Sequence, residues 1–130
     1  MSDENTILKS ITPILLVVDV PTSAEYFRDK LGFEIDFLYG EPPFYGAVSR
    51  DTVCIHLRCV HRPNFAELAA REVSLILATI EVADVHTLCK ELTARGAEIA
   101  QQPTKHDWGG TDFHIRDPDG NVISFVSFAP

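Results

Sequence analysis

The chain has 130 residues, of which 45% are hydrophobic and 23% are charged, and this size and composition are typical of one soluble globular domain covering residues 1–130. No apolar run approaches the roughly 20 residues that span a bilayer, and the polar, acidic start differs from a signal peptide, so we expect a cytoplasmic protein without membrane contact. The net charge of −8 argues against nucleic acid as a partner, because phosphates repel acidic surfaces, and is compatible with a neutral or cationic small ligand.

The three cysteines form an odd number and lack metal-site spacing. Cys54 and Cys59 point to opposite faces of one expected strand, because their separation along the chain is odd. Together with Cys89 they are interpreted as reduced, buried thiols.

The first half of the chain predicts a strand, a helix and three more strands within residues 11–60. The helix begins at Thr22 or Ser23, either of which can cap it, and Gly32 ends it. Pro13 near the start of the first strand indicates an edge or a bend. The expected strands cover residues 11–18, 33–38, 44–49 and 52–59.

The second half follows a connecting segment, residues 61–72, whose apolar residues are spaced as in a short helix. Asp84 opens a further helix that ends before Gly96. A loop is expected at residues 101–107. The expected strands cover residues 73–82 and 97–100, followed by both strands of a hairpin within residues 108–126.

The hairpin at residues 108–126 is the clearest pattern in the sequence. Asp117-Pro118-Asp119-Gly120 supplies its turn, since proline has the φ of position i+1 and glycine can adopt the left-handed conformation. Before the turn, apolar residues alternate with His114 and Arg116, so one face of that strand carries titratable side chains.

The two halves repeat one pattern. The matching stretches are Asp19-Val20 and Leu31–Ile35 in the first half, and Asp84-Val85 and Arg95–Ile99 in the second. The chain is therefore predicted to be an α+β protein of two β-α-β-β-β modules, residues 11–60 and 73–128, joined by residues 61–72. Four curved strands per module leave a concave face, and two such faces can enclose a cleft.

Val18-Asp19-Val20, Phe27–Phe33 and Arg116–Asn121 together resemble the vicinal oxygen chelate superfamily. This superfamily includes glyoxalase I, extradiol dioxygenases, fosfomycin-resistance enzymes and bleomycin-resistance proteins. The resemblance covers Ile11 to Ser127 and implies the glyoxalase/bleomycin-resistance/dihydroxybiphenyl dioxygenase-like fold. It does not fix the chemistry, because one fold hosts many functions.

Metal-dependent members of this superfamily hold a divalent ion with His and Glu at positions that correspond here to Thr12, His56, Leu77 and Ser124. Leu77 and Ser124 are unsuited to such an ion, so we expect no metal and no cofactor. A metal site built from His56 and His114 stays open as an alternative, and both are weak candidates for catalytic proton transfer. His114 matches a tyrosine that faces the reaction centre in extradiol dioxygenases. Its simpler interpretation is a histidine bonded to a backbone carbonyl or solvent.

Among the members of the superfamily that bind no metal, the closest resemblance is to bleomycin-resistance proteins. It is carried by Phe33–Phe37, Phe44–Val48, Trp108-Gly109 and Phe113–Pro118. Those proteins are acidic homodimers that bind a cationic glycopeptide at the subunit interface and stack its flat tail between aromatic side chains. The resemblance implies that Phe44 and Trp108 form such a clamp, that Asp36 and Phe37 lie alongside it, and that Pro13 bends an arm toward the other subunit. Alternatively, Phe44 belongs to the core and Trp108 covers a sheet edge.

We therefore predict a homodimer that binds a flat aromatic or cationic compound without a metal, as antibiotic-resistance proteins of this type do. The residues expected to line its clefts are Asp36, Phe37, Phe44, His56, Trp108, His114 and Arg116. One alternative is a lyase, isomerase or dioxygenase of the glyoxalase type with an atypical metal site. A second is a regulator that uses the dimer groove for a peptide.

Overall fold

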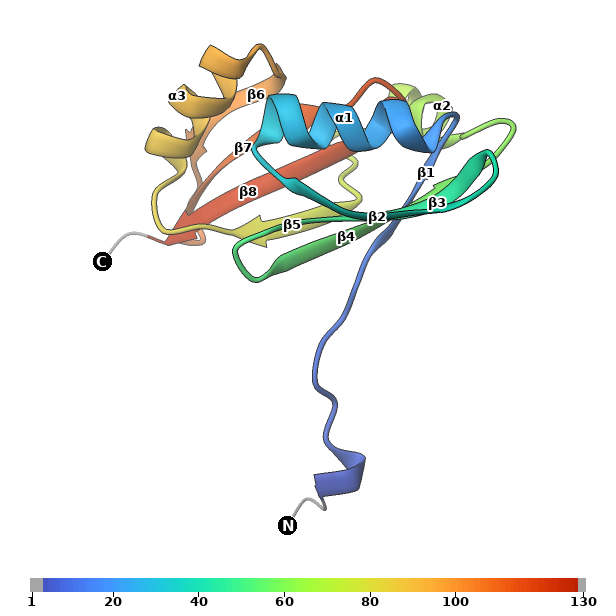
Figure 1. Ribbon diagram of the computed structural model, residues 1–130. Helices are drawn as coiled ribbons and strands as arrows, with labels where there is room; N and C mark the ends of the chain where they lie inside the picture. Colours follow the sequence, from blue (N-terminus) through green and yellow to red (C-terminus); the bar gives the residue numbers. More distant parts are fainter. Residues whose placement is uncertain (1–3, 129–130) are drawn as a thin grey trace.

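The computed structural model describes residues 4–128 and consists of two four-stranded sheets with helices packed against them (Figure 1). A short 3-10 helix, Glu4–Thr6, precedes the first sheet. The first module contains β1 (Ile14–Val17), α1 (Val20–Leu31), β2 (Glu34–Gly40), β3 (Pro43–Arg50) and β4 (Val53–Cys59). Next come α2 (Phe65–Arg71) in the connecting segment and the second module, with β5 (Ala78–Glu81), α3 (Val85–Arg95), β6 (Glu98–Lys105), β7 (Gly110–Arg116) and β8 (Val122–Phe128). The prediction of two β-α-β-β-β modules is confirmed.

Both sheets have the same topology. The strand order is β1-β4-β3-β2 in the first sheet and β5-β8-β7-β6 in the second. In each, the first strand pairs in parallel with the last strand of its module, and the other pairs are antiparallel. The repeat in the sequence therefore corresponds to a repeat in the strand pairing.

Helices α1 and α3 have equivalent ends. The side chain of Asp19 accepts a hydrogen bond from the Thr22 amide at 2.9 Å, and the side chain of Asp84 accepts one from the His86 amide at 2.9 Å. Gly32 and Gly96 end the helices with φ of 74° and 91°, which a residue with a Cβ rarely adopts.

The expected start of α1 at Thr22 or Ser23 is wrong, because Asp19 caps the helix and Val20 is its first residue. Pro21 is tolerated in this first turn, where a backbone N–H has no partner within the helix. Ala24, Phe27 and Leu31 lie on one face of α1 and are buried.

Two strand predictions need correction. The strand expected at residues 73–82 begins only at Ala78, because the chain turns at Ser74, whose φ is 58°, and the apolar Val73 is 92% exposed. The loop expected at residues 101–107 is largely strand, since β6 continues to Lys105. This edge strand tolerates Pro103 by shifting its register against β7 between Gln101 and Thr104.

All three cysteines are free, but they are not all buried. Cys89 is buried on α3, Cys54 is partly exposed, and Cys59 is exposed at the end of β4. The Cys59 thiol donates to the backbone carbonyl of Val18, with 3.2 Å between sulfur and oxygen. The prediction of buried thiols is therefore correct for Cys89 and wrong for Cys59.

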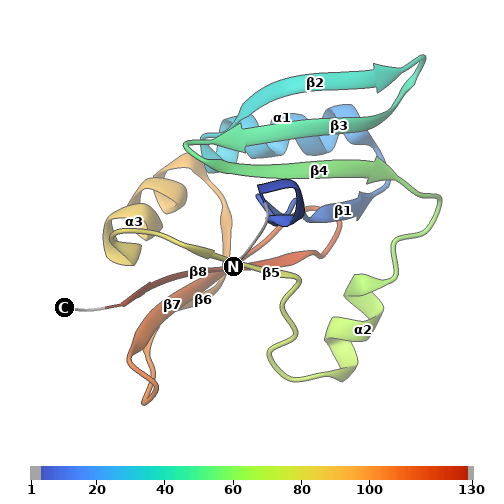
Figure 2. The ribbon, with the colours of Figure 1, turned by 90° about the horizontal axis from the view of Figure 1, so that it is seen from below.

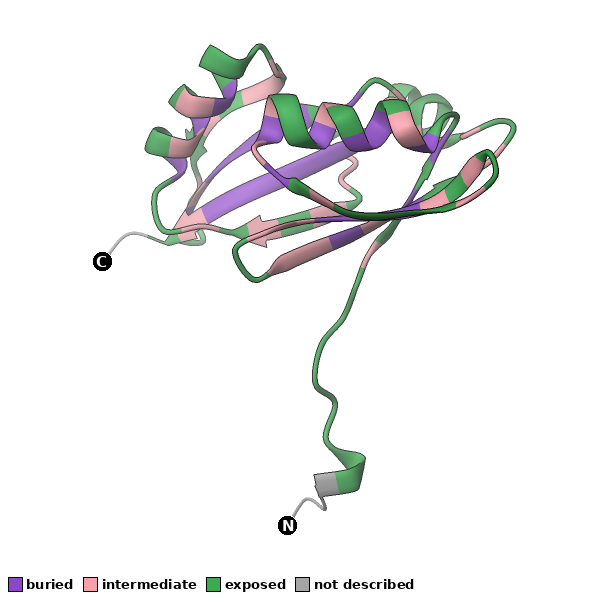
Figure 3. Cartoon of the chain, viewed as in Figure 1, coloured by how far each residue is buried: buried purple, intermediate pink, exposed green. Residues whose placement is uncertain are grey.

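The hydrophobic core draws on both modules. In the first module the Phe27 and Phe33 rings meet edge to face at 5.3 Å, and in the second the Phe113 and Phe125 rings stack at 5.2 Å. Figure 3 shows buried residues along the inner side of α1 and over most of β8. The other face of the first sheet points away from α1, and neither α1 nor α3 covers it (Figures 1 and 2).

The turn after β7 links the two modules. The side-chain amide of Asn121 donates to the carbonyl of Leu16 at 3.2 Å, and the carboxylate of Asp119 accepts from the Val18 amide at 3.0 Å. Both acceptor and donor lie where β1 leads into α1. The Asp117–Asn121 segment thus closes its own hairpin and also holds the start of the first module.

Residues 4–13 extend away from both sheets as an arm (Figure 1). Leu8 and Ile11 in this arm are 96% and 92% exposed. Within the described part of the chain, we find no helix with the length and apolar character needed to traverse a bilayer.

Candidate ligand-binding surfaces

The uncovered face of the first sheet carries aromatic side chains, and we call it the open face. The register of the strands places Phe37 beside Ala47 and Ala47 beside His56, so these three residues share this face. The Phe37 ring meets the His56 ring at a right-angled orientation with 6.0 Å between centroids. The Tyr45 hydroxyl lies 2.9 Å from Nδ1 of His56 and fixes the orientation of the imidazole.

The open face is also apolar and accessible. Ile14 and Leu16 of β1 lie on it by their register with β4 and are 51% and 40% exposed. Phe37 is 45% exposed. Contiguous exposed apolar surface of this kind is typical of an interaction or ligand-binding site.

Phe44 lies at the tip of the β2–β3 hairpin. Its ring meets the Tyr39 ring at 5.5 Å, and the two side chains are 51% and 63% exposed. A Cβ built on Gly40 would lie 2.4 Å from Cδ1 of Phe44, so the ring folds back closely over this glycine. The alternative of a core position for Phe44 is therefore wrong.

On the second sheet, the face that bears His114 holds a hydrogen-bond network around the carboxylate of Asp112. Its Oδ1 accepts from Nε2 of His106 at 2.6 Å and from the side-chain amide of Gln101 at 3.0 Å. Its Oδ2 accepts from Nε2 of His114 at 3.2 Å and from the Ser124 hydroxyl at 3.4 Å. Asp112, His114 and Ser124 are buried, so the network satisfies polar groups that water does not reach.

The network decides the charge of Asp112. Burial raises the pKa of this carboxyl group. The hydrogen bonds from His106 and His114 lower the pKa, and together with the charges of the two histidines they outweigh burial, so the pKa lies below its usual value. Asp112 is therefore an anion at neutral pH.

Trp108 lies in the loop between β6 and β7, next to this network. Its indole stacks on the imidazole of His106 with 4.9 Å between ring centroids and 8° between ring planes. The Phe128 ring approaches it at 6.0 Å and 60°. The indole remains 60% exposed and can contact a ligand.

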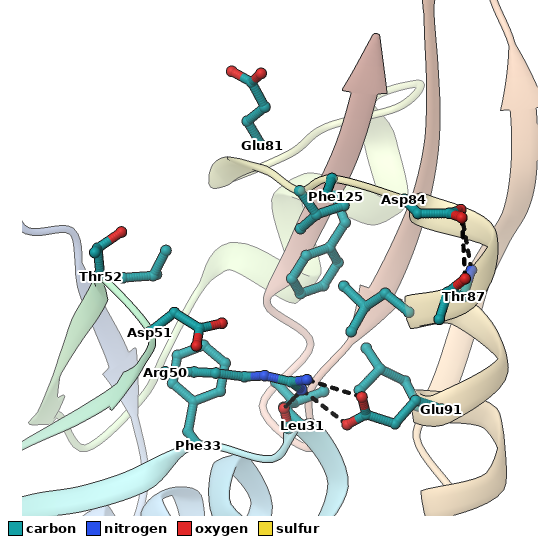
Figure 4. Close-up of a pocket in the computed structure, with 15 residues that line it drawn as sticks. Leu31, Phe33, Arg50, Asp51, Thr52, Glu81, Asp84, Thr87, Glu91 and Phe125 are labelled. Carbon is teal, nitrogen blue, oxygen red and sulfur yellow. Dashed lines mark hydrogen bonds and ion pairs between the residues drawn. The ribbon is translucent and has the colours of Figure 1, made fainter. Parts of the chain in front are cut away.

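A separate cavity of about 430 Å³ lies between the two modules, close to the ends of α1 and α3 (Figure 4). Its apolar lining includes Phe33, Leu88 and Phe125. Arg50 crosses it and donates from Nη1 and Nη2 to the carboxylate of Glu91 at 2.9 and 2.8 Å. The hydrogen bond with Arg50 holds the pKa of Glu91 below its usual value, so the pair is ionised and mutually satisfied.

The structure distributes the predicted site residues over both modules. Phe37 and His56 are in contact on the open face. Asp36 lies in the same sheet and accepts a hydrogen bond from the Ser49 hydroxyl at 2.8 Å. Phe44 lies in the first module, whereas Trp108 lies in the second.

The remaining predicted residues, His114 and Arg116, lie along β7. Both line a cavity of about 200 Å³, together with Ser74 and Leu75. Arg116 is exposed and pairs with Glu98 on β6. His114 bonds to Asp112, which corrects the expectation of a backbone carbonyl or solvent as its partner.

The positions used for metal binding in related folds are also separated between the sheets. His56 lies in β4 of the first sheet and Ser124 in β8 of the second. His114 is in β7 of the second sheet. Across residues 4–128, no three or more His, Cys, Asp or Glu side chains are grouped so that they could hold a metal ion.

Sequence reasoning missed Tyr45, His106 and Asp112. Asp112 could have been found, because it precedes His114 by two residues in an expected strand and therefore shares its face. His106 gave no such signal, since its approach to Asp112 depends on the unpredicted extension of β6.

The protein is an α+β protein of two paired modules, each a sheet with a helix on one side. The other side of each sheet carries aromatic or imidazole side chains that can face a ligand. The chain belongs to the Glyoxalase/Bleomycin resistance protein/Dioxygenase superfamily, because the model of that family matches residues 7–125.

Several related proteins support this assignment. The uncharacterized protein YraH of Bacillus subtilis (strain 168) is 28% identical over 118 residues, which cover 84% of this chain and 90% of YraH. The bleomycin-binding protein of Streptomyces verticillus, solved with copper(II)-bleomycin, is 26% identical with a TM-score of 0.75 and coverage of 95% and 99% of the two chains. A bleomycin resistance determinant of transposon Tn5 is 20% identical with a TM-score of 0.75 and coverage of 95% and 100%, and shares the fold.

Proposed function

We propose that this protein binds and sequesters a small flat aromatic or cationic compound in clefts formed between two copies of the chain, in the manner of bleomycin-resistance proteins. The observation that carries the proposal is the accessible aromatic surface formed by Phe37, Tyr39 and Phe44. The similarity to a structure that contains copper(II)-bleomycin supports this class of ligand.

Stacking would supply much of the binding free energy. An aromatic pair contributes about 0.5–1.5 kcal/mol beyond the burial of its surface. Phe44 and Trp108 belong to different modules, and association of two copies would bring Phe44 of one toward Trp108 of the other. The net charge of −8 favours a cationic ligand over an anionic one.

The exposed arm and open face support the homodimer. Leu8 and Ile11 of the arm, together with Ile14 and Leu16 of β1, present apolar side chains that no other part of the described chain covers well. A second copy would remove this surface from water, which is worth about 25 cal/mol per Å². Pro13 separates the arm from β1 and suits a change of direction there.

We propose that binding does not require a metal bound by the protein. Leu77 and Ser124 stand at two of the positions that hold ligands in metal-dependent relatives of this fold. Neither side chain offers the imidazole or carboxylate that a divalent ion prefers. This part of the proposal would fail if the purified protein retained near-stoichiometric zinc, nickel, iron or manganese after dialysis.

The main experiment combines mass and fluorescence. Light scattering should give twice the 14.5 kDa mass of the chain. Titration with bleomycin should quench Trp108, and Phe44→Ala should weaken binding several-fold. Phe65→Ala, on the surface helix α2, is the matched control and should bind as the unchanged protein does. A monomer whose fluorescence does not respond to bleomycin or other flat cations would contradict the proposal.

A further inference from the structure

Trp108 is the sole tryptophan of the sequence, and its indole is held on more than one side. The His106 imidazole lies parallel to it at 4.9 Å, whereas Phe128 meets it at 60°. Phe128 is itself 54% exposed, so the indole and this ring together form an accessible aromatic corner.

Gly110 makes this position of the indole possible. A Cβ on Gly110 would lie 1.9 Å from Cζ3 and 2.6 Å from Cη2 of Trp108, which means that the six-membered ring rests on the glycine backbone. Gly110 does not have a positive φ, in contrast to Gly109 with φ of 101°. Glycine is therefore needed at position 110 to leave room for the indole ring, and not to allow a left-handed backbone conformation.

The buried hydrogen-bond network around Asp112 fixes the orientation of the His106 imidazole. Its Nε2 donates to Asp112 at 2.6 Å, and the same carboxylate oxygen accepts from Gln101 at 3.0 Å. His106 cannot rotate without losing a hydrogen bond to an anion, which is among the stronger kinds in proteins. The plane on which the indole stacks is thus set by the carboxylate of Asp112, a residue that is 7% exposed.

We propose that His106, Gly110 and Asp112 are positioning residues that hold the Trp108 indole in one orientation before a ligand arrives. The preformed pair of parallel rings then accepts a further flat heteroaromatic ring on the exposed indole surface. This inference rests on the proposed function in that Trp108 contacts the ligand. Its physical basis is preorganisation, since a side chain that is already ordered loses little entropy on binding.

The fluorescence of the single tryptophan tests the positioning without any ligand. Gly110→Ala and His106→Gln should each shift the emission to longer wavelength and increase the rapid component of the anisotropy decay, because the indole gains freedom and water contact. His106→Phe keeps a flat ring beneath the indole but lacks the hydrogen bond to Asp112, so it should return the anisotropy only part of the way toward that of the unchanged protein. His86→Gln, at an exposed position on α3, is the matched control and should change neither quantity.

The inference is overturned if Gly110→Ala and His106→Gln, folded by circular dichroism, show the emission and anisotropy of the unchanged protein. Should His106→Gln fail to fold, Gly110→Ala alone decides, because Gly110 does not have a positive φ and the three atoms nearest to an added Cβ all belong to Trp108.

Metal-free bleomycin and the flat dye proflavine are the ligand probes. Both variants should bind them about 3- to 10-fold more weakly, the range expected for one aromatic stacking contact, and His106→Phe, which keeps the ring but not the hydrogen bond to Asp112, should bind more tightly than His106→Gln and more weakly than the unchanged protein. Equal binding by variants with altered anisotropy would overturn the role in binding. If neither probe binds the unchanged protein, the proposed function fails, and the anisotropy still decides whether these residues position Trp108.

Discussion

Replacing Asn121 by alanine should destabilise the protein strongly, because its buried side chain links the two modules. Its amide donates to the Leu16 carbonyl at 3.2 Å and to Oδ2 of Asp117 at 3.0 Å. Asn121 is 1% exposed, so water cannot replace either bond. The backbone N–H of residue 121 still bonds to Asp117 in the variant, which keeps the hairpin turn itself intact.

The expected loss follows from these two bonds. A neutral hydrogen bond contributes about 1 kcal/mol and one to a charged group about 1.5–3 kcal/mol, so Asn121→Ala should lower the free energy of unfolding by about 3 kcal/mol. For a chain of this length, that corresponds to a fall in Tm of about 10 °C. Asn121→Asp should be worse at neutral pH, because it sets a second carboxylate beside Asp117, and should recover in part on acidification.

Urea unfolding followed by circular dichroism measures these changes. Asn64→Ala is the matched control, since Asn64 is exposed and its side chain makes no capping hydrogen bond to α2. It should alter stability by less than about 0.5 kcal/mol. If Asn121→Ala costs no more than Asn64→Ala, the bonds from the turn to Leu16 do not hold the modules together and the reasoning is wrong.

Three further results are expected. Glu91→Gln removes the charge that pairs with Arg50 but keeps the shape of the side chain, and because both partners are about one-third exposed, urea unfolding should show a loss of at most about 1 kcal/mol. Burial raises the pKa of Asp117 to about 6, so this group favours folding when protonated. As pH rises from about 4 to above 6, the unfolding free energy of the unchanged protein should therefore fall by up to about 3 kcal/mol relative to Asp117→Asn, and a constant difference would contradict this. In thiol labelling of the native protein, Cys59 should react first and Cys89 only on unfolding, so Cys59→Ser should remove the fastest phase.

The parts of the fold that could be predicted are those specified by local chemistry. Asp117-Pro118-Asp119-Gly120 fixes its turn through the φ of proline and glycine, and alternation along β7 fixes which residues face the core. Gly32 and Gly96 likewise mark the helix ends. None of these features depends on distant contacts, which is why the sequence alone sufficed.

The parts that could not be predicted depend on distant pairing. Residues 73–77 are as apolar as a strand, yet the chain turns at Ser74 and the pairing of β5 with β8 begins at Ala78. The strand β6 contains Pro103 and five polar or charged residues, and pairing with β7 extends it to Lys105. Local composition therefore favoured a strand in the first case and a loop in the second, and long-range pairing reversed both.

The same distinction applies to the candidate site. The contact between Phe37 and His56 lies within one sheet, on the open face. Both residues could be selected from the sequence because the family resemblance assigns them to the binding cleft. The position of Trp108 could not be predicted, because it depends on the space over Gly110 and on the imidazole of His106. The glycine at position 110 thus decides where an aromatic side chain lies.

Equivalent rows across the two sheets show how the repeated modules have come to differ. In the first sheet the row is Phe37, Ala47 and His56, and in the second it is Gln101, His114 and Ser124.

The first of these rows is aromatic and partly accessible, whereas His114 and Ser124 in the second row bond to Asp112 and are buried. Buried polar groups that already bond to one another have few free donors or acceptors for a ligand. Their hydrogen bonds hold the neighbouring side chains in fixed orientations. One module therefore presents contact surface on its sheet, while the other uses the same face to hold Trp108 at its edge. Ligand contacts are expected from the first-sheet row and from Trp108, and substitutions in the buried row should act through the orientation of Trp108.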